Sequence, residues 1–169
     1  IKMLNIKKLL VNKSLWLRKE IFEMVIRVNQ GHIASAFSQC EIVISLFYGN
    51  ILKYKKGNPN YSNRDRFIIS NGHGSMLLYS LLYLTGYKSI KLEDIKNFRQ
   101  LNSICAGHPE YEKNSGIETT TGPLGQGIAN SVGFAIAEEI LKSKFGKSKI
   151  NHKTYVTVGD GCLMEGISH

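Results

Sequence analysis

Three histidines in this sequence share a local pattern. His32, His73 and His108 each follow a glycine directly, in the stretches QGHIAS, NGHGS and AGHPE. A neutral imidazole can both donate and accept hydrogen bonds, and it can carry protons near pH 7. Three such side chains would suit a substrate rich in hydroxyl groups, such as a sugar. The other two histidines, His152 and His169, lack this setting.

Two glycine-rich stretches could handle anions and cations. In GDG, Asp160 follows a short apolar strand, and a carboxylate there is a ligand type that a divalent cation bound to phosphates prefers. The alternative is a tight turn in which the aspartate bonds to its own backbone. GPLGQG precedes a helix, so its backbone N–H groups could approach a phosphate. The alternative for this stretch is close packing without a ligand.

The elements around His73 indicate why a histidine would lie there. Phe67–Ile69 is apolar and β-branched, which predicts a buried strand, and Met76–Leu84 is continuously apolar, which predicts a buried helix. His73 therefore falls in a strand-to-helix turn, at the strand end where α/β proteins bind ligands. Ser70 and Asn71 could instead simply cap the helix.

The remaining pattern predicts an α/β fold with a parallel sheet flanked by helices. Helices are expected at 15–29, at 38–52 with a capping box of Ser38 and Glu41, at 91–101, and from Gly125 or Gln126 to Phe145. A strand is expected at Thr154–Val158, and residues 102–127 form a long connection, which is usually functional or disordered. The predicted buried face of the long helix consists of Ile128, Val132, Ile136 and Ile140.

Composition limits the class of protein. The chain has 169 residues, is 43% hydrophobic and carries a formal net charge of +9. No stretch is long enough to span a membrane, and the start of the sequence does not resemble a signal peptide. Cys40, Cys105 and Cys162 lack metal-ligand spacing and fit a reducing cytoplasm. Dispersed lysines make a nucleic-acid partner a weak alternative, although the positive charge would attract phosphorylated substrates.

Several long motifs together resemble transketolase. In order and spacing they are NRDRF, SNGHGSMLLYSLLYLTGY, KNFRQL, AGHPEY, GIETTTGPLGQGIANSVGFAIAEE and GDGCLMEGISH, and they cover the chain from about Leu15 to His169. Deoxyxylulose-phosphate synthases and pyruvate dehydrogenases share the glycine–aspartate–glycine turn, but they do not normally carry GHPE and TTTGPLGQG. The resemblance implies a thiamine-diphosphate-binding fold of the transketolase type.

The resemblance also implies roles for individual residues. His73 would contact thiamine diphosphate, His32 would contact the sugar and support catalysis, and His108 would face the C1 hydroxyl of the donor. Asp160 would bind the Mg²⁺ or Ca²⁺ that holds the diphosphate. Glu165 would lie near a dimer interface, against the partner's cofactor-activating glutamate. The backbone along the cofactor, and beside its metal, would be that of Gly122, Pro123, Leu124 and Gly161.

The implied activity is transfer of a two-carbon ketol unit between sugar phosphates in the pentose phosphate pathway, by a cytoplasmic homodimer without nucleic-acid or membrane partners. A dihydroxyacetone-synthase-like transferase and a catalytically inactive paralogue that acts as a binding partner are the alternatives. Ile33, Phe37 and Ala106 depart from the usual family pattern around the donor pocket.

The thiamine motif of the family closes with a pair of asparagines that do not follow GDG here. Residues 1–169 are therefore expected to be the N-terminal part of the diphosphate-binding domain, truncated, with the pyrimidine-binding and C-terminal domains absent. On this interpretation the chain alone is expected to be inactive.

Overall fold

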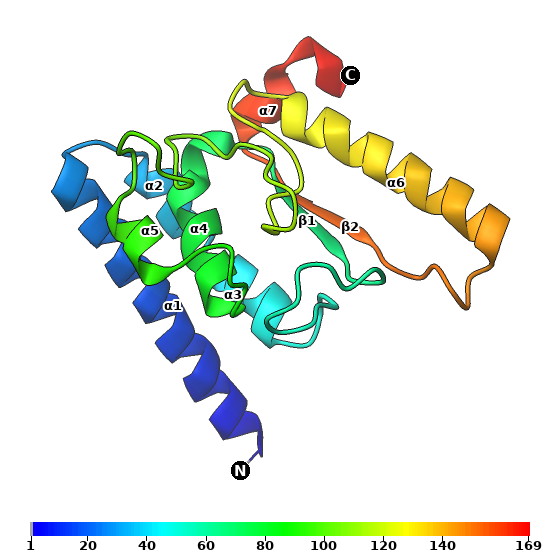
Figure 1. The fold of residues 1–169 in the computed structure, drawn as a ribbon, viewed down its shortest axis with the longest axis horizontal. Coiled ribbons are helices and arrows are strands. Elements are labelled where there is room, and N and C mark those ends of the chain that lie inside the picture. The colour runs from blue at the N-terminus through cyan, green and yellow to red at the C-terminus, as the bar shows by residue number, and fades with distance from the viewer. Residues whose placement is uncertain (1) are drawn as a thin grey trace.

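The computed structural model describes residues 2–169, and Figure 1 shows a group of helices beside a small sheet that carries one long helix. The helical group consists of α1 (Lys2–Val28), α2 (Ile33–Ser38), α3 (Cys40–Tyr48), α4 (Ser75–Leu84) and α5 (Leu92–Lys96). Its core lies where α1 and α3 pack against α4. The fully buried side chains there include Leu17, Ile21, Met24, Met76, Leu77, Tyr79 and Leu81.

Helix α4 is buried on nearly all sides, as its continuous run of apolar residues predicts. Residues 75–82 are all buried, including Ser75 and Ser80. A 3₁₀ turn at Gly72–Gly74 leads into the helix, so His73 lies between a strand and a helix as predicted. The buried helix fixes where this turn points.

The sheet has two parallel strands, which confirms the predicted topology. Strand β1 (Arg66–Ile69) pairs with β2 (Thr154–Thr157), so that Arg66 lies opposite Thr154 and Ile69 opposite Thr157. The connection between them passes through α4, α5 and the long helix α6 (Gln126–Phe145). Because the strands are parallel, the turns after both carboxyl ends lie at one edge of the sheet.

At the other end of the sheet, where both strands begin, the buried carboxylate of Asp65 links three segments of the chain. One oxygen accepts a hydrogen bond from the backbone N–H of Lys53 at 2.7 Å, and the other accepts one from the N–H of Lys153 at 2.8 Å. A single side chain therefore holds the start of β1 to the preceding loop and to the segment before β2.

Two helix predictions in the N-terminal half are wrong in detail. The helix expected at 38–52 is two helices, because α2 ends at Ser38 and α3 begins at Cys40. The predicted capping box does not form. The Ser38 hydroxyl donates to the carbonyl of Ser35, and Glu41 pairs with Arg18 of α1 at 2.6 Å. The first helix begins well before residue 15, and α5 ends at Lys96 because Arg99 and Asn102 adopt positive φ.

The predicted buried face of α6 is also wrong. Val132, Ile136 and Ile140 are more than half exposed, and the buried residues of the helix are Gly127, Ser131 and Glu138. The helix approaches the sheet through its small residues, which allow the backbones to come close. Gly127 lies so near the end of β1 that an added Cβ would be 2.4 Å from the Cα of Ser70.

Among residues 2–169, no helix combines the length and the apolar character that crossing a membrane requires.

Candidate functional site

A cleft of about 510 Å³ opens at the edge of the sheet where both strands end. His73 comes from the turn after β1, Asp160 and Gly161 come from the turn after β2, and Leu124 comes from the loop before α6. Helix α2 closes the other side. The remaining lining residues are Ala34, Ser35, Ser38, Gln39, Asn71, Val158, Gly159 and Cys162.

The three glycine-preceded histidines are neighbours beside this cleft, and His73 is the one that lines it. The rings of His32 and His73 are 5.0 Å apart between centroids. His108 lies beside Gly122, where an added Cβ would be 3.4 Å from the His108 ring. Burial lowers the pKa of His73, and the neighbouring charges of His32 and His108 lower it further. Burial also lowers the pKa of His108, with Arg99 and His32 adding to the effect. Both rings are therefore neutral at pH 7, and each can accept one hydrogen bond and donate another.

The position of His108 is set by hydrogen bonds from helix α4 to the loop that carries it. The hydroxyl of Ser75 donates to the carbonyl of Gly107 at 2.8 Å, and the hydroxyl of Tyr79 donates to the carbonyl of Ala106 at 2.9 Å. The buried helix thus orients both His73, through the turn that precedes it, and His108. The long connection at 102–127 is ordered on the protein in this way.

Glycines allow the loops of the site to touch one another. A Cβ added to Gly72 would lie 2.6 Å from the backbone nitrogen of Gly122, so the turn after β1 and the GPLGQG stretch are in direct backbone contact. Gly125 has φ of +83° and precedes α6, the conformation that glycine adopts at least cost. Leu124, the residue before Gly125, lines the cleft, so α6 begins close to it.

Ser70 joins three parts of the site. Its hydroxyl oxygen accepts a hydrogen bond from the backbone N–H of Ile128 at 3.0 Å, and the hydroxyl donates to the sulfur of Cys162 at 3.3 Å. The end of β1 is thereby connected to α6 and to α7 (Asp160–Met164). The spacing between His73 and Asp160 across the cleft depends on this connection.

Asp160 is exposed and is the first residue of α7. One carboxylate oxygen accepts a hydrogen bond from the N–H of Gly161 at 2.9 Å. This is the bond to the local backbone that the sequence analysis gave as the alternative to a metal ligand. No group of three or more histidine, cysteine, aspartate or glutamate side chains is placed to hold a metal within the described residues. The cleft therefore offers one carboxylate to a divalent cation, which needs about six oxygen ligands.

Glu165 and Pro123 are exposed and do not line the cleft. Glu165 lies after α7, where its Cβ is close to Gly125: an added Cβ on that glycine would be 2.8 Å away. Its backbone carbonyl accepts a hydrogen bond from the N–H of Ser168 at 2.9 Å, in the final 3₁₀ turn Gly166–Ser168. Its side chain is exposed and lies next to the residue that precedes α6.

Asn71 is a site residue that the sequence pattern treated only as a possible helix cap. It lines the cleft, and its side-chain oxygen is buried without a hydrogen-bond partner among the described residues. The hydroxyl oxygen of Thr121, next to Gly122, is also buried without a hydrogen-bond partner among the described residues. Buried polar atoms are nearly always bonded, so these two suit a ligand with donor groups. The signal in the sequence was a polar Ser-Asn pair directly after a buried strand.

The histidine cluster gives a first testable prediction. Replacing His32 with glutamine is expected to raise the pKa of His73, because it removes one neighbouring positive charge, while burial still keeps the pKa below its ordinary value. A lowered pKa in the folded state also means that stability decreases as pH falls from about 7 towards 5, where the unfolded chain binds the proton more readily. NMR titration of the His73 ring would measure the shift. An unchanged His73 titration in the His32 variant would contradict the cluster.

Comparison with known proteins identifies the class to which this fold and cleft belong. The chain matches the family described as "Transketolase, thiamine diphosphate binding domain" over residues 7–169. Because this match covers nearly the whole chain, the chain belongs to that family. The fold type and the thiamine diphosphate class of cofactor agree with the sequence-based prediction.

The individual relatives that match this chain carry the name transketolase. The chain is 55% identical over 150 residues to the transketolase of Buchnera aphidicola, covering 87% of this chain and 22% of that protein. It is 50% identical over 158 residues to that of Treponema pallidum, covering 92% of this chain and 24% of the relative. The solved transketolase of Campylobacter jejuni superposes with a TM-score of 0.89 at 46% identity, over 95% of this chain and 25% of that one. The chain thus spans about a quarter of the length of these relatives.

Proposed function

We propose that this chain forms the diphosphate-binding part of a transketolase, which transfers a two-carbon ketol unit from a ketose phosphate to an aldose phosphate. The observation that carries the proposal is that His73 and Asp160, from segments far apart in the sequence, line one cleft, with the ring of His32 5.0 Å from that of His73. Residues 1–169 would represent the N-terminal part of that domain, in an enzyme that also has pyrimidine-binding and C-terminal domains.

The residues of the cleft suit thiamine diphosphate. Asn71 lines the cleft and has a buried side-chain oxygen without a partner among the described residues, and His73, Asp160 and Gly161 line the same cleft. Bound thiamine diphosphate supplies the nucleophilic carbon that accepts the ketol unit. In this proposal His73 contacts the cofactor, and the backbone of Gly122, Pro123 and Leu124 lies along it.

The remaining roles concern the substrate and the metal. His32 and His108 hydrogen-bond the hydroxyls of the sugar phosphate, and an imidazole can pass a proton at these oxygens. Asp160, with Gly161 beside it, supplies one oxygen to Mg²⁺ or Ca²⁺.

Assembly and location follow from the same proposal. The outward-facing Glu165 would meet the cofactor-activating glutamate of a second subunit, so the active site would form at the interface of a homodimer. Cys40, Cys105 and Cys162 are free and buried, as expected for a protein of the reducing cytoplasm.

The metal assignment is tested by two substitutions in the complete enzyme. Asp160→Ala is expected to lose far more thiamine diphosphate affinity than His108→Ala, because it leaves the diphosphate charge uncompensated. Loss of one neutral hydrogen bond at His108 costs only about 1 kcal/mol. Calorimetric titration with thiamine diphosphate and Mg²⁺ measures both. Equal losses would remove Asp160 from the metal site.

The 169-residue polypeptide by itself is expected to bind thiamine diphosphate weakly and to show no turnover of xylulose 5-phosphate with ribose 5-phosphate. Its cleft contributes a single carboxylate to the metal, and the described residues contain no cluster of metal ligands. A coupled assay on the purified chain is the measurement. Turnover above background would refute the division of roles proposed here.

A further inference from the structure

A second cavity lies apart from the cleft. It has a volume of about 520 Å³ and lies at the start of β1, whereas the cleft lies where the strands end. Its walls are the loop before β1, the loop 111–118 and the side chain of Phe134 on α6. The lining residues are Pro59, Asn60, Tyr61, Arg64, Arg66, Tyr111, Glu112, Lys113, Asn114, Gly116, Ile117, Glu118 and Phe134.

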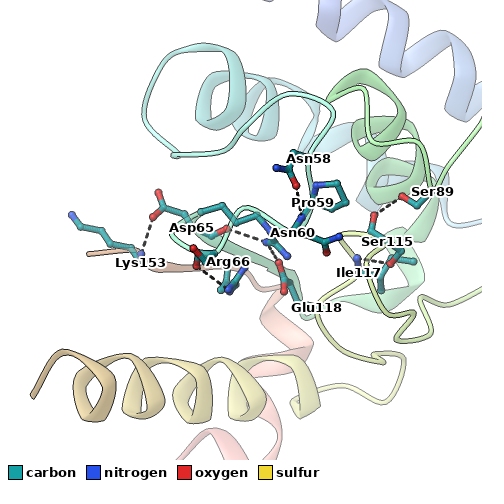
Figure 2. A network of polar contacts seen from close by, with 12 residues as sticks. Asn58, Pro59, Asn60, Asp65, Arg66, Ser89, Ser115, Ile117, Glu118 and Lys153 are labelled. Carbon is teal, nitrogen blue, oxygen red and sulfur yellow. Dashed lines mark hydrogen bonds and ion pairs between the residues drawn. The ribbon is translucent and has the colours of Figure 1, made fainter. Parts of the chain in front are cut away.

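Both walls of this cavity are fixed by hydrogen bonds. Arg64 donates from Nε to the carbonyl of Pro59 at 2.5 Å and pairs with Glu118 of the opposite wall. On that second wall, the Ser89 hydroxyl donates to the carbonyl of Ser115 at 2.7 Å, and the Ser115 hydroxyl oxygen accepts from the N–H of Ile117 at 2.9 Å. Figure 2 shows the contacts of Ser89, Ser115 and Ile117 on this second wall. The cavity is therefore built before any ligand binds.

The guanidinium of Arg66 forms no salt bridge among the described residues, although the carboxylates of Glu118 and Asp65 lie near enough to act on its charge. Arg64 already neutralises Glu118, and the guanidinium of Arg66 makes one long hydrogen bond among the described residues, to the carbonyl of Ser62 at 3.4 Å. In Figure 2, Arg66 and Glu118 lie side by side below the loop of Asn58 and Pro59. Burial, together with the like charge of Arg64, lowers the pKa of Arg66. A positive charge in such surroundings is stabilised by an added anion.

The rest of the lining indicates the kind of anion. Lys113 adds a second positive charge, against one remaining carboxylate, that of Glu112. Tyr61, Tyr111 and Phe134 offer ring surfaces, and a guanidinium binds carboxylate or phosphate oxygens in pairs. A volume of this size falls in the range of small-molecule sites.

We propose that this cavity binds a small organic oxyanion with a flat or aromatic body, held by the guanidinium of Arg66 and the ammonium of Lys113. The carboxylate or phosphate of the ligand faces Arg66, and its body lies against the tyrosines. The loop 111–118 continues along the chain to Leu124, which lines the cleft. An anion bound to this loop therefore also steadies the segment that leads to the candidate cofactor site.

Calorimetric titration of the full chain with phenyl phosphate, benzoate and benzyl alcohol tests the proposal. Saturable binding of either anion, with none of neutral benzyl alcohol, is expected, and the stronger of the two identifies the oxyanion. Arg66→Gln should weaken the affinity for the anion at least tenfold. Lys113→Gln, at an exposed position, should weaken this affinity several-fold. Exposed Glu112→Gln should strengthen it, because that variant removes the remaining carboxylate of the lining.

A variant of the other site separates this proposal from the proposed function. His73→Gln should leave binding of the anion unchanged, because His73 lines only the cleft. Equal affinity in the Arg66, Lys113 and Glu112 variants, or no saturable binding up to about 10 mM, would overturn the proposal. If the Arg66 variant fails to fold, the opposite changes expected for the two exposed variants still decide the matter.

Discussion

Gly127→Ala is expected to destabilise the protein by about 3 kcal/mol, although alanine is normally the better helix former. Its Cβ would lie 2.4 Å from the Cα and 2.9 Å from the hydroxyl oxygen of Ser70. The Cα is a backbone atom directly after β1 and cannot rotate away, so α6 has to move off the sheet. Forcing an extra methyl group into a packed contact lowers the free energy of unfolding by about 1–3 kcal/mol, and occasionally by more. The displacement also breaks the hydrogen bond from the Ile128 N–H to Ser70.

Gly133→Ala provides the matched control on the same helix. Nothing lies within 4 Å of the Cβ that this substitution adds. Only the greater helix preference of alanine over glycine remains, and it should stabilise the protein by about 0.5–1 kcal/mol. Urea denaturation of both variants measures the difference. If Gly127→Ala were as stable as Gly133→Ala, the close contact between α6 and β1 would be wrong.

Glu118→Gln is expected to have the other large effect, a loss of about 3 kcal/mol. The side chains of Glu118 and Arg64 are only 9% and 10% exposed, so neutralising Glu118 leaves the Arg64 charge buried without its partner. Arg64 also donates to the carbonyls of Pro59 and Asp65, which keeps it in place after the change. The charge therefore cannot turn out into water without giving up further bonds.

The matched control for this pair is Glu41→Gln, at the exposed pair between α1 and α3. Arg18 and Glu41 are bonded through two nitrogens of the guanidinium, but Glu41 is 59% exposed, so solvent replaces the lost contact. The expected loss is about 0.5 kcal/mol. The double replacement Arg64→Met with Glu118→Leu should be less damaging than Glu118→Gln alone. Equal losses at the two pairs would show that the Arg64 pair is not buried.

Much of the site could be predicted because its residues lie where the local pattern changes. Phe67–Ile69 and the apolar run after it establish a buried strand and helix, and these place His73 in the turn between them. Asp160 follows the second strand in the same manner. Since parallel strands end at one edge, the two turns had to meet. His108 depended on the resemblance, because no periodicity constrains its loop.

The errors have physical causes that the sequence pattern does not reveal. Val132, Ile136 and Ile140 form a regular apolar stripe, yet close backbone approach selects the face with Gly127 and Ser131. Glu41 is at capping-box distance from Ser38, but a guanidinium from another helix is the stronger partner. Asn71 was overlooked because an unpaired oxygen becomes visible only when its surroundings are known.

Strand β1 lies between two parts of the molecule that each carry half of the cleft. Figure 1 shows α1–α5 on one side of β1, and β2, α6 and α7 on the other. His32 and His73 belong to the first part, and Asp160 and Leu124 to the second. Four residue pairs join the two strands, and the side chains of Asp65 and Ser70 add hydrogen bonds between the two parts. A molecule bound across the cleft therefore adds its binding free energy to the docking of β2 and α6, and amide hydrogen exchange in that part slows with ligand concentration. Occupancy of the cleft would thus regulate how often the carboxyl-terminal third opens.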